Sequence, residues 1–533
     1  MVIDAKTVPE NQSIETDICI IGAGAAGIAL AKALSTTKHR IAILESGSFD
    51  FNQDTQSLYQ GKNVGIPYFP LHAARLRFFG GTTNHWGGYC DPFEDFDFVR
   101  REGIPHTGWP IQKSDIDPYY SEAADFCRIT TKEWKNAYWE EQDKSPAFHF
   151  EDQRVDNKII QITPSTSRHF GSIYREAVTA AENVTTYLNA NVTGIVSNEA
   201  GRQVSHVEVA TLEGNRFTVK SRQFILAAGG IENPRILLLS TKRHRNGLGN
   251  QNDLVGRFFM EHPRFTAGRF YPASNKIKLG FYSAHKVNNV QIKGHLVLAR
   301  KVLEAEQLVD VQMKLTPAYD QKYVDALDAK SGNSLVYMMK SLSHGKAPDE
   351  FSKHLSRVVF DIENLPTFAY SKYFKDSLPV HHVELVTRLD AVPNPDSRVL
   401  LSASERDQLG QPRVELDWRL SDLDRRSAVR AAEIMAEEFG QNGLGRLQMN
   451  ISESDREWPA DTAGGFHHMG TTRMSDDPKQ GVVDKDCKVH GIANLYVAGS
   501  SVFTTAGSGS PTLTIVALAL RLADHLKKGM ASS

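Results

Sequence analysis

Residues 17–45 constrain the fold most, because they combine a strand, a glycine-rich turn, a helix and a second strand in one short unit. Residues 17–21 form a short apolar run that is typical of a buried parallel strand. The run Gly22-Ala23-Gly24-Ala25-Ala26-Gly27 follows directly. Residues 28–34 are small or apolar and predict a helix, and residues 40–45 predict the second strand. With a strand before it and a helix after it, the glycine pattern predicts a dinucleotide-binding turn.

Each glycine of this turn has a separate physical role. Gly22 permits the tight turn out of the strand, Gly24 lets the backbone approach a pyrophosphate, and Gly27 allows close packing of the helix on the sheet. Ala25 and Ala26 begin the helix, whose free N–H groups attract phosphate. We expect Glu45, at the end of the second strand, to accept hydrogen bonds from the adenosine ribose. The turn by itself fits both NAD and FAD.

Length and composition limit the class of protein. The chain has 533 residues, more than one compact core usually holds, so we expect two lobes. Its formal net charge of -2 gives no electrostatic case for binding nucleic acid or an anionic membrane. Four scattered cysteines without a CxxC pair argue against a zinc site, an iron–sulfur cluster or a disulfide framework. The polar start of the chain and the lack of a long apolar stretch predict a cytoplasmic protein that needs no membrane.

Four further segments resemble the glucose–methanol–choline (GMC) oxidoreductase family, in the order in which the family carries them. They are Gly80-Gly81-Thr82-Thr83-Asn84-His85-Trp86, residues 227–235, residues 255–263, and His467-His468-Met469-Gly470-Thr471-Thr472-Arg473-Met474 followed by residues 494–514. Within the family, the loop at Asn84 to Trp86 and the run Ser510-Pro511-Thr512-Leu513-Thr514 are most similar to the pyranose oxidase-like branch. Residues 263–451 match nothing specific.

The resemblance implies an α/β protein with a discontinuous, Rossmann-like FAD-binding domain and a second α+β lobe that binds substrate. We expect the FAD-binding domain to comprise residues 14–130, 184–262 and 452–533. The substrate-binding or cap lobe would then comprise residues 131–183 and 263–451. The resemblance also implies FAD as cofactor, no metal, an alcohol substrate such as a sugar, glycoside or other polyol, and an electron acceptor that is oxygen or another compound.

Alcohol oxidation needs a base that takes the hydroxyl proton while hydride leaves for flavin N5. His467 stands at the family's histidine position and is the predicted base, because an imidazole exchanges protons near neutral pH. Its neighbour His468 is the alternative. Adjacent residues of an extended segment point to opposite sides, so we expect only one of the two to face the flavin.

The helix expected from Pro511 to Leu526 would stabilise the charge that arrives on the reduced flavin. Its N-terminus, with Pro511 and Thr512, can direct free N–H groups at the N1–C2=O edge of the ring. The residue before this proline is usually Asn or His in the family, where it pairs with the base to hold the substrate oxygen. This chain has Ser510 there, whose hydroxyl also donates a hydrogen bond but has a shorter reach.

Other predicted cofactor contacts follow from the resemblance. The loop contributes Gly81, Thr82, Asn84, His85 and Trp86 to the isoalloxazine ring. His85 stands where pyranose oxidase-like sequences attach FAD covalently, but Gly87 and Gly88 favour noncovalent contact instead. Val192 is expected near adenine, and Gly499 and Ser500 near the pyrophosphate or the ribityl chain.

Two alternatives remain at the level of the sequence. A flavoprotein of the same fold could act as a lyase that uses the active-site histidine without net oxidation, and Ser510 leaves this open. A pure binding protein fits poorly, because it gives no reason for His467 and a helix start to converge on a cofactor.

Overall fold

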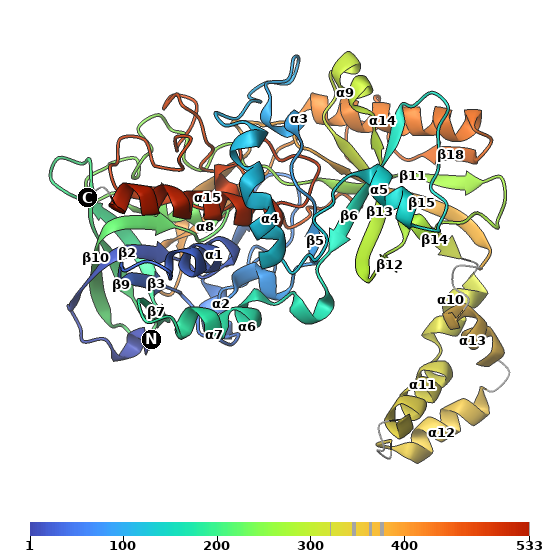
Figure 1. Ribbon diagram of the computed structural model, residues 1–533, viewed down its shortest axis with the longest axis horizontal. Helices are drawn as coiled ribbons and strands as arrows, with labels where there is room; N and C mark the ends of the chain where they lie inside the picture. Colours follow the sequence, from blue (N-terminus) through green and yellow to red (C-terminus); the bar gives the residue numbers. More distant parts are fainter. Residues whose placement is uncertain (320, 344–347, 362–364, 374–377, 532–533) are drawn as a thin grey trace.

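The computed structural model describes residues 1–319, 321–343, 348–361, 365–373 and 378–531. Two eight-stranded sheets lie next to each other along the long axis of the molecule (Figure 1). The chain passes between them several times, so both sheets are built from segments that are distant in sequence.

The first sheet contains the predicted strand–turn–helix–strand unit. Its strand order is β1 (Val2–Asp4), β7 (Val184–Leu188), β3 (Ile41–Leu44), β2 (Ser13–Ile21), β10 (Arg216–Leu226), β9 (Val204–Ala210) and β8 (Asn191–Ser197), and β19 (Leu495–Val497) also pairs with β10. Neighbouring strands in the run β1, β7, β3, β2 and β10 pair in parallel, and β19 also pairs in parallel with β10. At the edge of the sheet, β9 pairs antiparallel with both β10 and β8. The central parallel strands are buried apolar runs, as the sequence predicts.

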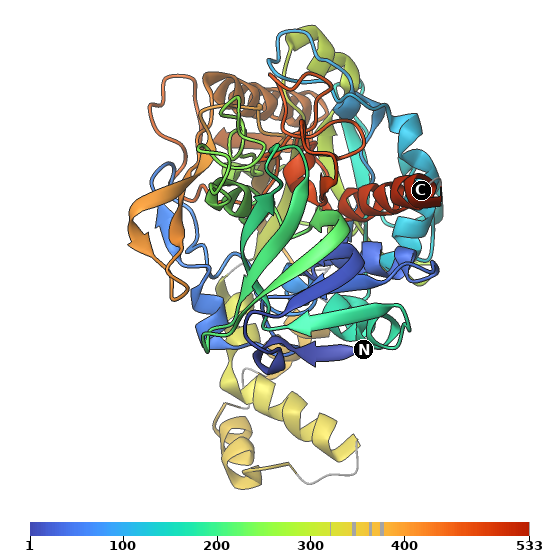
Figure 2. The same cartoon turned by 90° about the vertical axis from the view of Figure 1, so that its left-hand side faces the viewer.

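Helices α1 (Ala25–Leu34) and α15 (Thr512–Ala531) pack against each other, and α4 (Asp117–Phe126) packs on α15. Their buried faces belong to the same apolar core as the first sheet. Because the helix at the end of the chain rests on the first helix, the C-terminal segment is held beside the glycine turn (Figure 2).

The second sheet is antiparallel and has the order β18 (Gly445–Met449), β11 (Arg264–Pro272), β15 (Val380–Leu389), β14 (Val311–Tyr319), β13 (Val290–Leu298), β6 (Val155–Ile162) and β5 (Tyr89–Cys90), with β12 (His285–Val287) on β13. The long helix α14 (Asp422–Gln441) packs its buried side chains with the apolar side chains of these strands. One face of this sheet is therefore core, and the other face carries polar side chains.

A third, three-stranded sheet joins β16 (Arg398–Arg406), β17 (Pro412–Asp417) and β4 (Gly61–Asn63). Between β14 and β15, the described residues form helices that project from the molecule (Figures 1 and 2). They are α10 (Gln321–Asp328), α11 (Lys330–Ser343), α12 (Phe351–Phe360) and α13 (Leu365–Tyr373). The shorter helices are α2 (Gln53–Ser57), α3 (Asp95–Phe98), α5 (Asn136–Gln142), α6 (Phe170–Ile173), α7 (Arg175–Thr179), α8 (Glu232–Leu239) and α9 (Arg300–Glu306).

The predicted fold class, an α/β protein with a Rossmann-like sheet and a second α+β lobe, is confirmed. The predicted domain boundaries stay a prediction: β5 lies in the segment assigned to the FAD-binding domain yet pairs with β6 of the second sheet. Residues 78–91, expected to be a loop, also contain a 3-10 helix at Gly81–Asn84 and the strand β5. None of the described helices combines the length and the apolar character that crossing a bilayer requires.

Candidate active site

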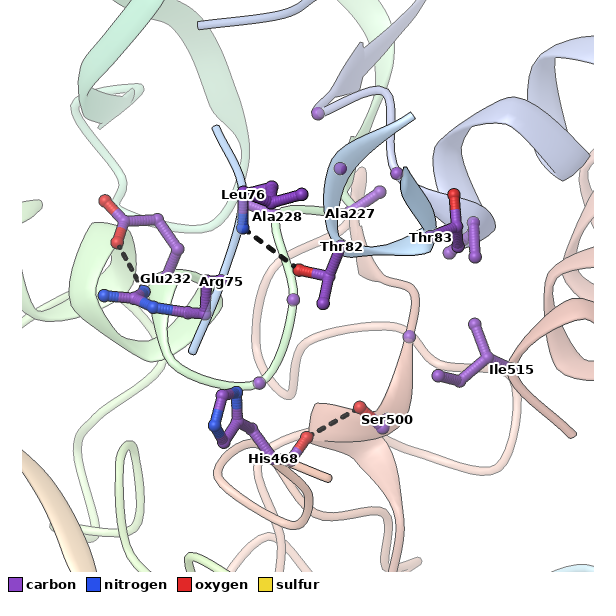
Figure 3. Close-up of a pocket in the computed structure, with 18 of the residues that line it drawn as sticks. Arg75, Leu76, Thr82, Thr83, Ala227, Ala228, Glu232, His468, Ser500 and Ile515 are labelled. Carbon is purple, nitrogen blue, oxygen red and sulfur yellow. Dashed lines mark hydrogen bonds and ion pairs between the residues drawn. The ribbon is translucent and has the colours of Figure 1, made fainter. Parts of the chain in front are cut away.

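One cavity connects the glycine turn of the first sheet with the histidine segment near the end of the chain (Figure 3). Most of the side chains and backbone groups predicted from the sequence lie on its wall: Gly22, Gly24, Ala25, Ala26, Glu45, Gly81, Thr82, His85, Trp86, Val192, His467, Gly499, Ser500, Ser510, Pro511 and Thr512. Two predicted residues, Gly27 and Asn84, do not line it.

Gly27 acts through packing rather than through contact with the cavity. A Cβ atom at this position would lie 2.0 Å from the carbonyl oxygen of Gly22, so only glycine lets the helix approach the turn this closely. Gly22 itself has a φ of +103°, which favours glycine. The Asn84 amide is used locally, since its Nδ2 donates to the carbonyl oxygen of Phe79 at 2.9 Å.

The start of α1 is shaped to receive a phosphate group. Gly24 is the N-cap residue and supplies no side chain to the first-turn N–H groups. A Cβ atom added at Gly24 would meet nothing within 4 Å, because the space in front of it is the open cavity. Uncapped N–H groups that face open space at a helix start form an anion site, which is what a pyrophosphate needs.

The Glu45 carboxylate is buried beside this turn. It accepts hydrogen bonds from the backbone N–H of Ala23 at 2.8 Å and of Gly47 at 2.9 Å. Burial raises the pKa of Glu45. The carboxylate therefore holds the glycine turn against the end of β3 while still lining the cavity, and its contact with a ribose stays a prediction.

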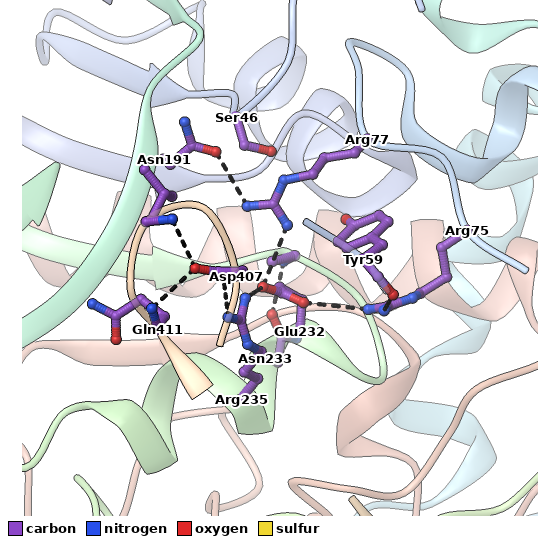
Figure 4. A network of polar contacts seen from close by, with 12 residues as sticks. Ser46, Tyr59, Arg75, Arg77, Asn191, Glu232, Asn233, Arg235, Asp407 and Gln411 are labelled. Atoms are coloured by element: carbon purple, nitrogen blue, oxygen red, sulfur yellow. Dashed lines mark hydrogen bonds and ion pairs between the residues drawn. The ribbon is translucent and has the colours of Figure 1, made fainter. Parts of the chain in front are cut away.

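A buried network of charges stands next to this end of the cavity (Figure 4). Glu232 forms ion pairs with Arg235 at 2.7 Å and with Arg75 and Arg77 at 3.3 Å each. Burial opposes ionisation, but these arginines lower the pKa of Glu232 to about 2. Arg75 also lies over the ring of Tyr59, with 3.9 Å between the guanidinium carbon and the ring centroid. The network makes this end of the cavity wall charged and rigid.

The His467 imidazole has a partner on only one of its two nitrogens. Its Nδ1 lies 2.7 Å from Nδ1 of His262, and Nε2 of His262 lies 2.6 Å from the carbonyl oxygen of Gly507. A carbonyl oxygen only accepts, so Nε2 of His262 carries a hydrogen and its Nδ1 is an acceptor. His467 must then donate from Nδ1. Its Nε2 therefore holds a free lone pair, and the described residues offer that atom no partner.

His468 also lines the cavity, which corrects the expectation that only one of the two histidines would face it. The segment around them bends, with φ of +64° at Phe466, so neighbouring side chains do not alternate as in a strand. However, Nε2 of His468 lies 2.9 Å from the Tyr68 hydroxyl, which donates to Glu261 at 2.5 Å. His468 must donate in this contact, so this nitrogen cannot act as a base.

The Glu261 carboxylate anchors the histidine segment. It accepts from the backbone N–H of His467 at 2.9 and 3.0 Å and from that of His262 at 2.8 Å. Burial raises the pKa of Glu261. Burial, followed by the charges of His262, Arg388 and His468, lowers the pKa of His467 well below its usual value. At neutral pH, His467 is therefore a neutral imidazole held in a fixed orientation.

Ser510 is held at the start of α15 by groups from elsewhere in the chain. Its backbone N–H donates to Asp91 at 2.8 Å. Its hydroxyl lies 3.5 Å from a guanidinium nitrogen of Arg388, whose other terminal nitrogen contacts Gln312 and the carbonyl oxygen of Ser508. A guanidinium thus stands beside the serine that replaces the family's usual Asn or His.

The loop before β5 contributes an aromatic wall. Trp86 donates from its indole nitrogen to the carbonyl oxygen of Arg168 at 2.6 Å and packs edge-on against Phe170. The Thr82 hydroxyl accepts from the backbone N–H of Leu76 at 3.3 Å, and Ser500 donates to the carbonyl oxygen of His468 at 2.7 Å (Figure 3). His85 is on the cavity wall, and its noncovalent contact with the flavin stays a prediction.

Several residues of the site were not identified from the sequence. Glu261 and Glu232 lie inside segments that resemble the family, so their place in those segments was an available signal. Tyr68, Gln312 and Arg388 come from segments without any motif, and only the folded chain brings them to the site. Within the described part of the chain, no group of three His, Cys, Asp or Glu side chains is arranged to hold a metal ion.

Comparison with known proteins identifies the same parts of the chain. Family models for GMC oxidoreductase match residues 172–264 and 393–519. The fructose dehydrogenase large subunit of Gluconobacter japonicus is 22% identical over 97% of this chain and 98% of its own length. The 2-methyl-1,2-propanediol dehydrogenase of Mycolicibacterium austroafricanum is 22% identical over 96% and 95%. The crystal structure of a formate oxidase superposes with a TM-score of 0.58 at 17% identity, covering 98% of this chain and all of the other.

FAD fits the residues present. The uncapped start of α1 and the Glu45 carboxylate would hold the pyrophosphate and adenosine end, and Trp86, Thr82, His467 and the start of α15 surround the other end of the same cavity. Bound FAD accounts for both the anion site at α1 and the neutral imidazole of His467, which lie on the wall of one cavity. The chain belongs to the GMC oxidoreductase family and is an FAD-dependent oxidoreductase.

Proposed function

We propose that this enzyme oxidises the carbinol carbon of a sugar, glycoside or other polyol, with His467 as the base. The observation that carries the proposal is the chain of contacts from Gly507 through His262 to His467. It leaves Nε2 of His467 unprotonated at the cavity, whereas Nε2 of His468 is engaged with the Tyr68 hydroxyl.

The residues of the chain divide the work of the reaction. FAD, when bound, supplies N5 as the acceptor of the hydride from the carbinol carbon. Nε2 of His467 takes the hydroxyl proton of the substrate, so the alcohol becomes a carbonyl and the imidazole becomes a cation. The Nδ1–H of His467 stays hydrogen-bonded to Nδ1 of His262 throughout, which preserves the orientation of the His467 ring. Such a positioned base contributes about 100- to 10,000-fold to the rate.

Ser510 and Arg388 would hold the substrate oxygen opposite the base. The serine hydroxyl and the guanidinium lie 3.5 Å apart, and both can donate to an oxygen that gains negative charge. The N-terminus of α15, at Pro511 and Thr512 on the cavity wall, would stabilise the charge that arrives on the flavin. In this arrangement Arg388 supplies the second polar group that a short serine side chain cannot.

The relatives support a polyol as substrate. Their names describe one enzyme as a fructose dehydrogenase subunit and the other as a dehydrogenase of a diol. Both names imply oxidation of an alcohol on a molecule with more than one hydroxyl group. A place in the pyranose oxidase-like branch, and oxygen or another compound as the acceptor that restores the flavin, form part of this proposal.

Anaerobic stopped-flow reduction of the bound flavin tests the proposal. The wild type should lose its visible flavin absorbance on mixing with a substrate from a panel of sugars, glycosides and inositols. His467→Ala should retain FAD and slow this reduction by about 100- to 10,000-fold. His206→Gln is the matched control, because His206 lies on β9 and contacts Ser205, away from the cavity. Unchanged reduction in His467→Ala would refute the role of the base. Turnover of a substrate while the flavin stays oxidised would refute oxidation and favour the lyase.

A further inference from the structure

The polar face of the second sheet carries a row of cationic side chains that leads toward His467. Directly opposed residues of an antiparallel pair share a face, and so do alternate residues of one strand. The register pairs Arg388 of β15 with Arg264 of β11 and with Gln312 of β14, and it pairs Gln312 with Val297 of β13. Lys314, His295 and Lys293 follow at alternate positions. We call Arg264, Lys293, Lys314 and Arg388 the cationic wall; His295 lies among them, and burial keeps it neutral by lowering its pKa well below the usual value.

This wall lies on the face opposite the core, and its Arg388 end lies at the active site. Arg388 contacts the carbonyl oxygen of Ser508 and reaches the Ser510 hydroxyl, and Gln312 donates to the Ser508 hydroxyl at 3.1 Å. The opposite face of the same strands is apolar and packs with α14. The wall therefore runs from the exposed Arg264 to the guanidinium beside Ser510.

Lys293 and Lys314 have no ion-pair partner among the described residues, whereas Asp91, Asp310 and Glu261 lie close enough to Arg388 to favour its charged form. Lys293 is only 7% exposed, and Lys314 lies close enough for its charge to disfavour the charged form of Lys293. Among the described residues, no carboxylate lies within 4 Å of the cationic atoms of Arg264, Lys293, Lys314 or Arg388. Glu384, farther along the same face of β15, is opposite Arg269 in the register.

The neighbouring Lys158 shows what a neutralised lysine looks like on this sheet. It is opposite His295 in the register, and its ammonium group pairs with Glu94 at 3.0 Å and lies 3.9 Å from Asp91. The segment after β5 thus supplies carboxylates for this buried lysine, and the described residues supply none for Lys293 and Lys314. The missing partner of that pair is a negative charge from outside the chain.

Unpaired polar atoms on the wall point to the same conclusion. Nε2 of His295 and Nε of Arg388 are both buried without a hydrogen-bond partner within the described structure. Burial, followed by the charge of Lys314, lowers the pKa of Lys293 to about 8. Two lysines placed together in a partly buried site cost free energy that a bound anion would recover.

We propose that the substrate is an anionic polyol, whose carboxylate or phosphate group binds to Lys293, Lys314 and Arg264 while its hydroxyl-bearing carbon lies at His467. This inference rests on the proposed function and names the class of substrate for the same site. A neutral sugar would leave the wall unpaired, and an amino sugar would be repelled by it.

Matched hexoses test the charge preference in the wild type. Anaerobic flavin reduction is measured with glucosamine, glucose, glucuronate and glucose 6-phosphate, which differ mainly in charge. We expect at least one of the two anions to give a second-order reduction rate about 10- to 100-fold above that of glucose, and glucosamine to react most slowly. The carboxylate and phosphate members separate the two sources of the negative charge. The advantage of the anion should shrink as ionic strength rises.

The double variant Lys293→Met/Lys314→Met tests the wall itself. Methionine keeps much of the length of the side chain and removes the charge, so the ratio of the rate with the anion to the rate with glucose should fall by about 10- to 100-fold. Lys286→Met is the matched control, because Lys286 is an exposed lysine on the adjacent β12. It should behave as the wild type.

Binding provides a second measurement that needs no turnover. Glucuronate or glucose 6-phosphate should raise the melting temperature of the FAD-loaded wild type more than glucose does, and the double variant should lose this difference. If sugars reduce the flavin but neither rate nor melting temperature depends on their charge, the cationic wall is not a substrate site. If no polyol of any charge reduces the flavin, the proposed function fails as well.

Discussion

Gly230→Ala tests whether the close contact between the turn after β10 and the histidine segment positions the base. A Cβ atom at Gly230 would lie 2.1 Å from the carbonyl oxygen of His468 and 2.8 Å from its Cβ atom. Real Cβ contacts almost never fall below 3.0 Å, so the two segments must separate by about 0.9 Å. Both atoms belong to, or are adjacent to, backbone, and neither can rotate away as the end of a flexible side chain could.

Hydrogen bonds oppose that separation on both sides of the contact. Thr471 donates to the carbonyl oxygen of Gly230 at 2.6 Å, and Ser500 donates to that of His468 at 2.7 Å. The displacement must therefore stretch these bonds or move His467 relative to the cavity. A misplacement of about 1 Å can reduce a catalytic rate by roughly 100-fold. We expect a loss of that size in the rate of flavin reduction, together with a loss of about 1–3 kcal/mol in the free energy of unfolding.

The assay compares Gly230→Ala with Gly440→Ala, each measured per mole of bound FAD. Gly440 lies in α14, where a Cβ atom would meet nothing within 4 Å, so alanine should stabilise the helix by about 0.5–1 kcal/mol and leave reduction unchanged. Wild-type reduction rates in Gly230→Ala would show that the contact does not position His467. Unfolding free energies from denaturant titration would show separately whether the strain is absorbed.

Two further predictions concern the cofactor and the base. In Gly24→Val the added side chain points into the open cavity, so the protein should fold with normal stability but contain little FAD; full flavin occupancy in the absorbance ratio of the purified variant would contradict the anion site at α1. Burial and the neighbouring charges lower the pKa of His467, and activity is lost only when pH falls through that lowered value. The rate of flavin reduction should therefore stay constant from about pH 8 to about pH 6, and a rate that halves near the free imidazole value of about 6.5 would contradict this prediction.

Local sequence patterns predicted the elements that depend on local interactions. The strand, turn and helix around Gly22, Gly24 and Gly27 follow from hydrophobic patterning and from steric limits that act within a few residues. The start of the last helix at Pro511 follows in the same way. Even here the choice between His467 and His468 rested on an assumed extended backbone, which the bend at Phe466 overturned.

The sequence by itself therefore determined the type of cofactor site, the family and the identity of the two candidate histidines. Only the tertiary structure decided which histidine is free, because that depends on partners such as His262 and Tyr68, which lie 205 and 400 residues away from the histidines they contact. It also placed Arg388 beside Ser510 and the two unpaired lysines on one sheet face, through the register of strands in a region without any motif. Contacts of this kind arise from strand pairing and packing, and no short stretch of sequence specifies them.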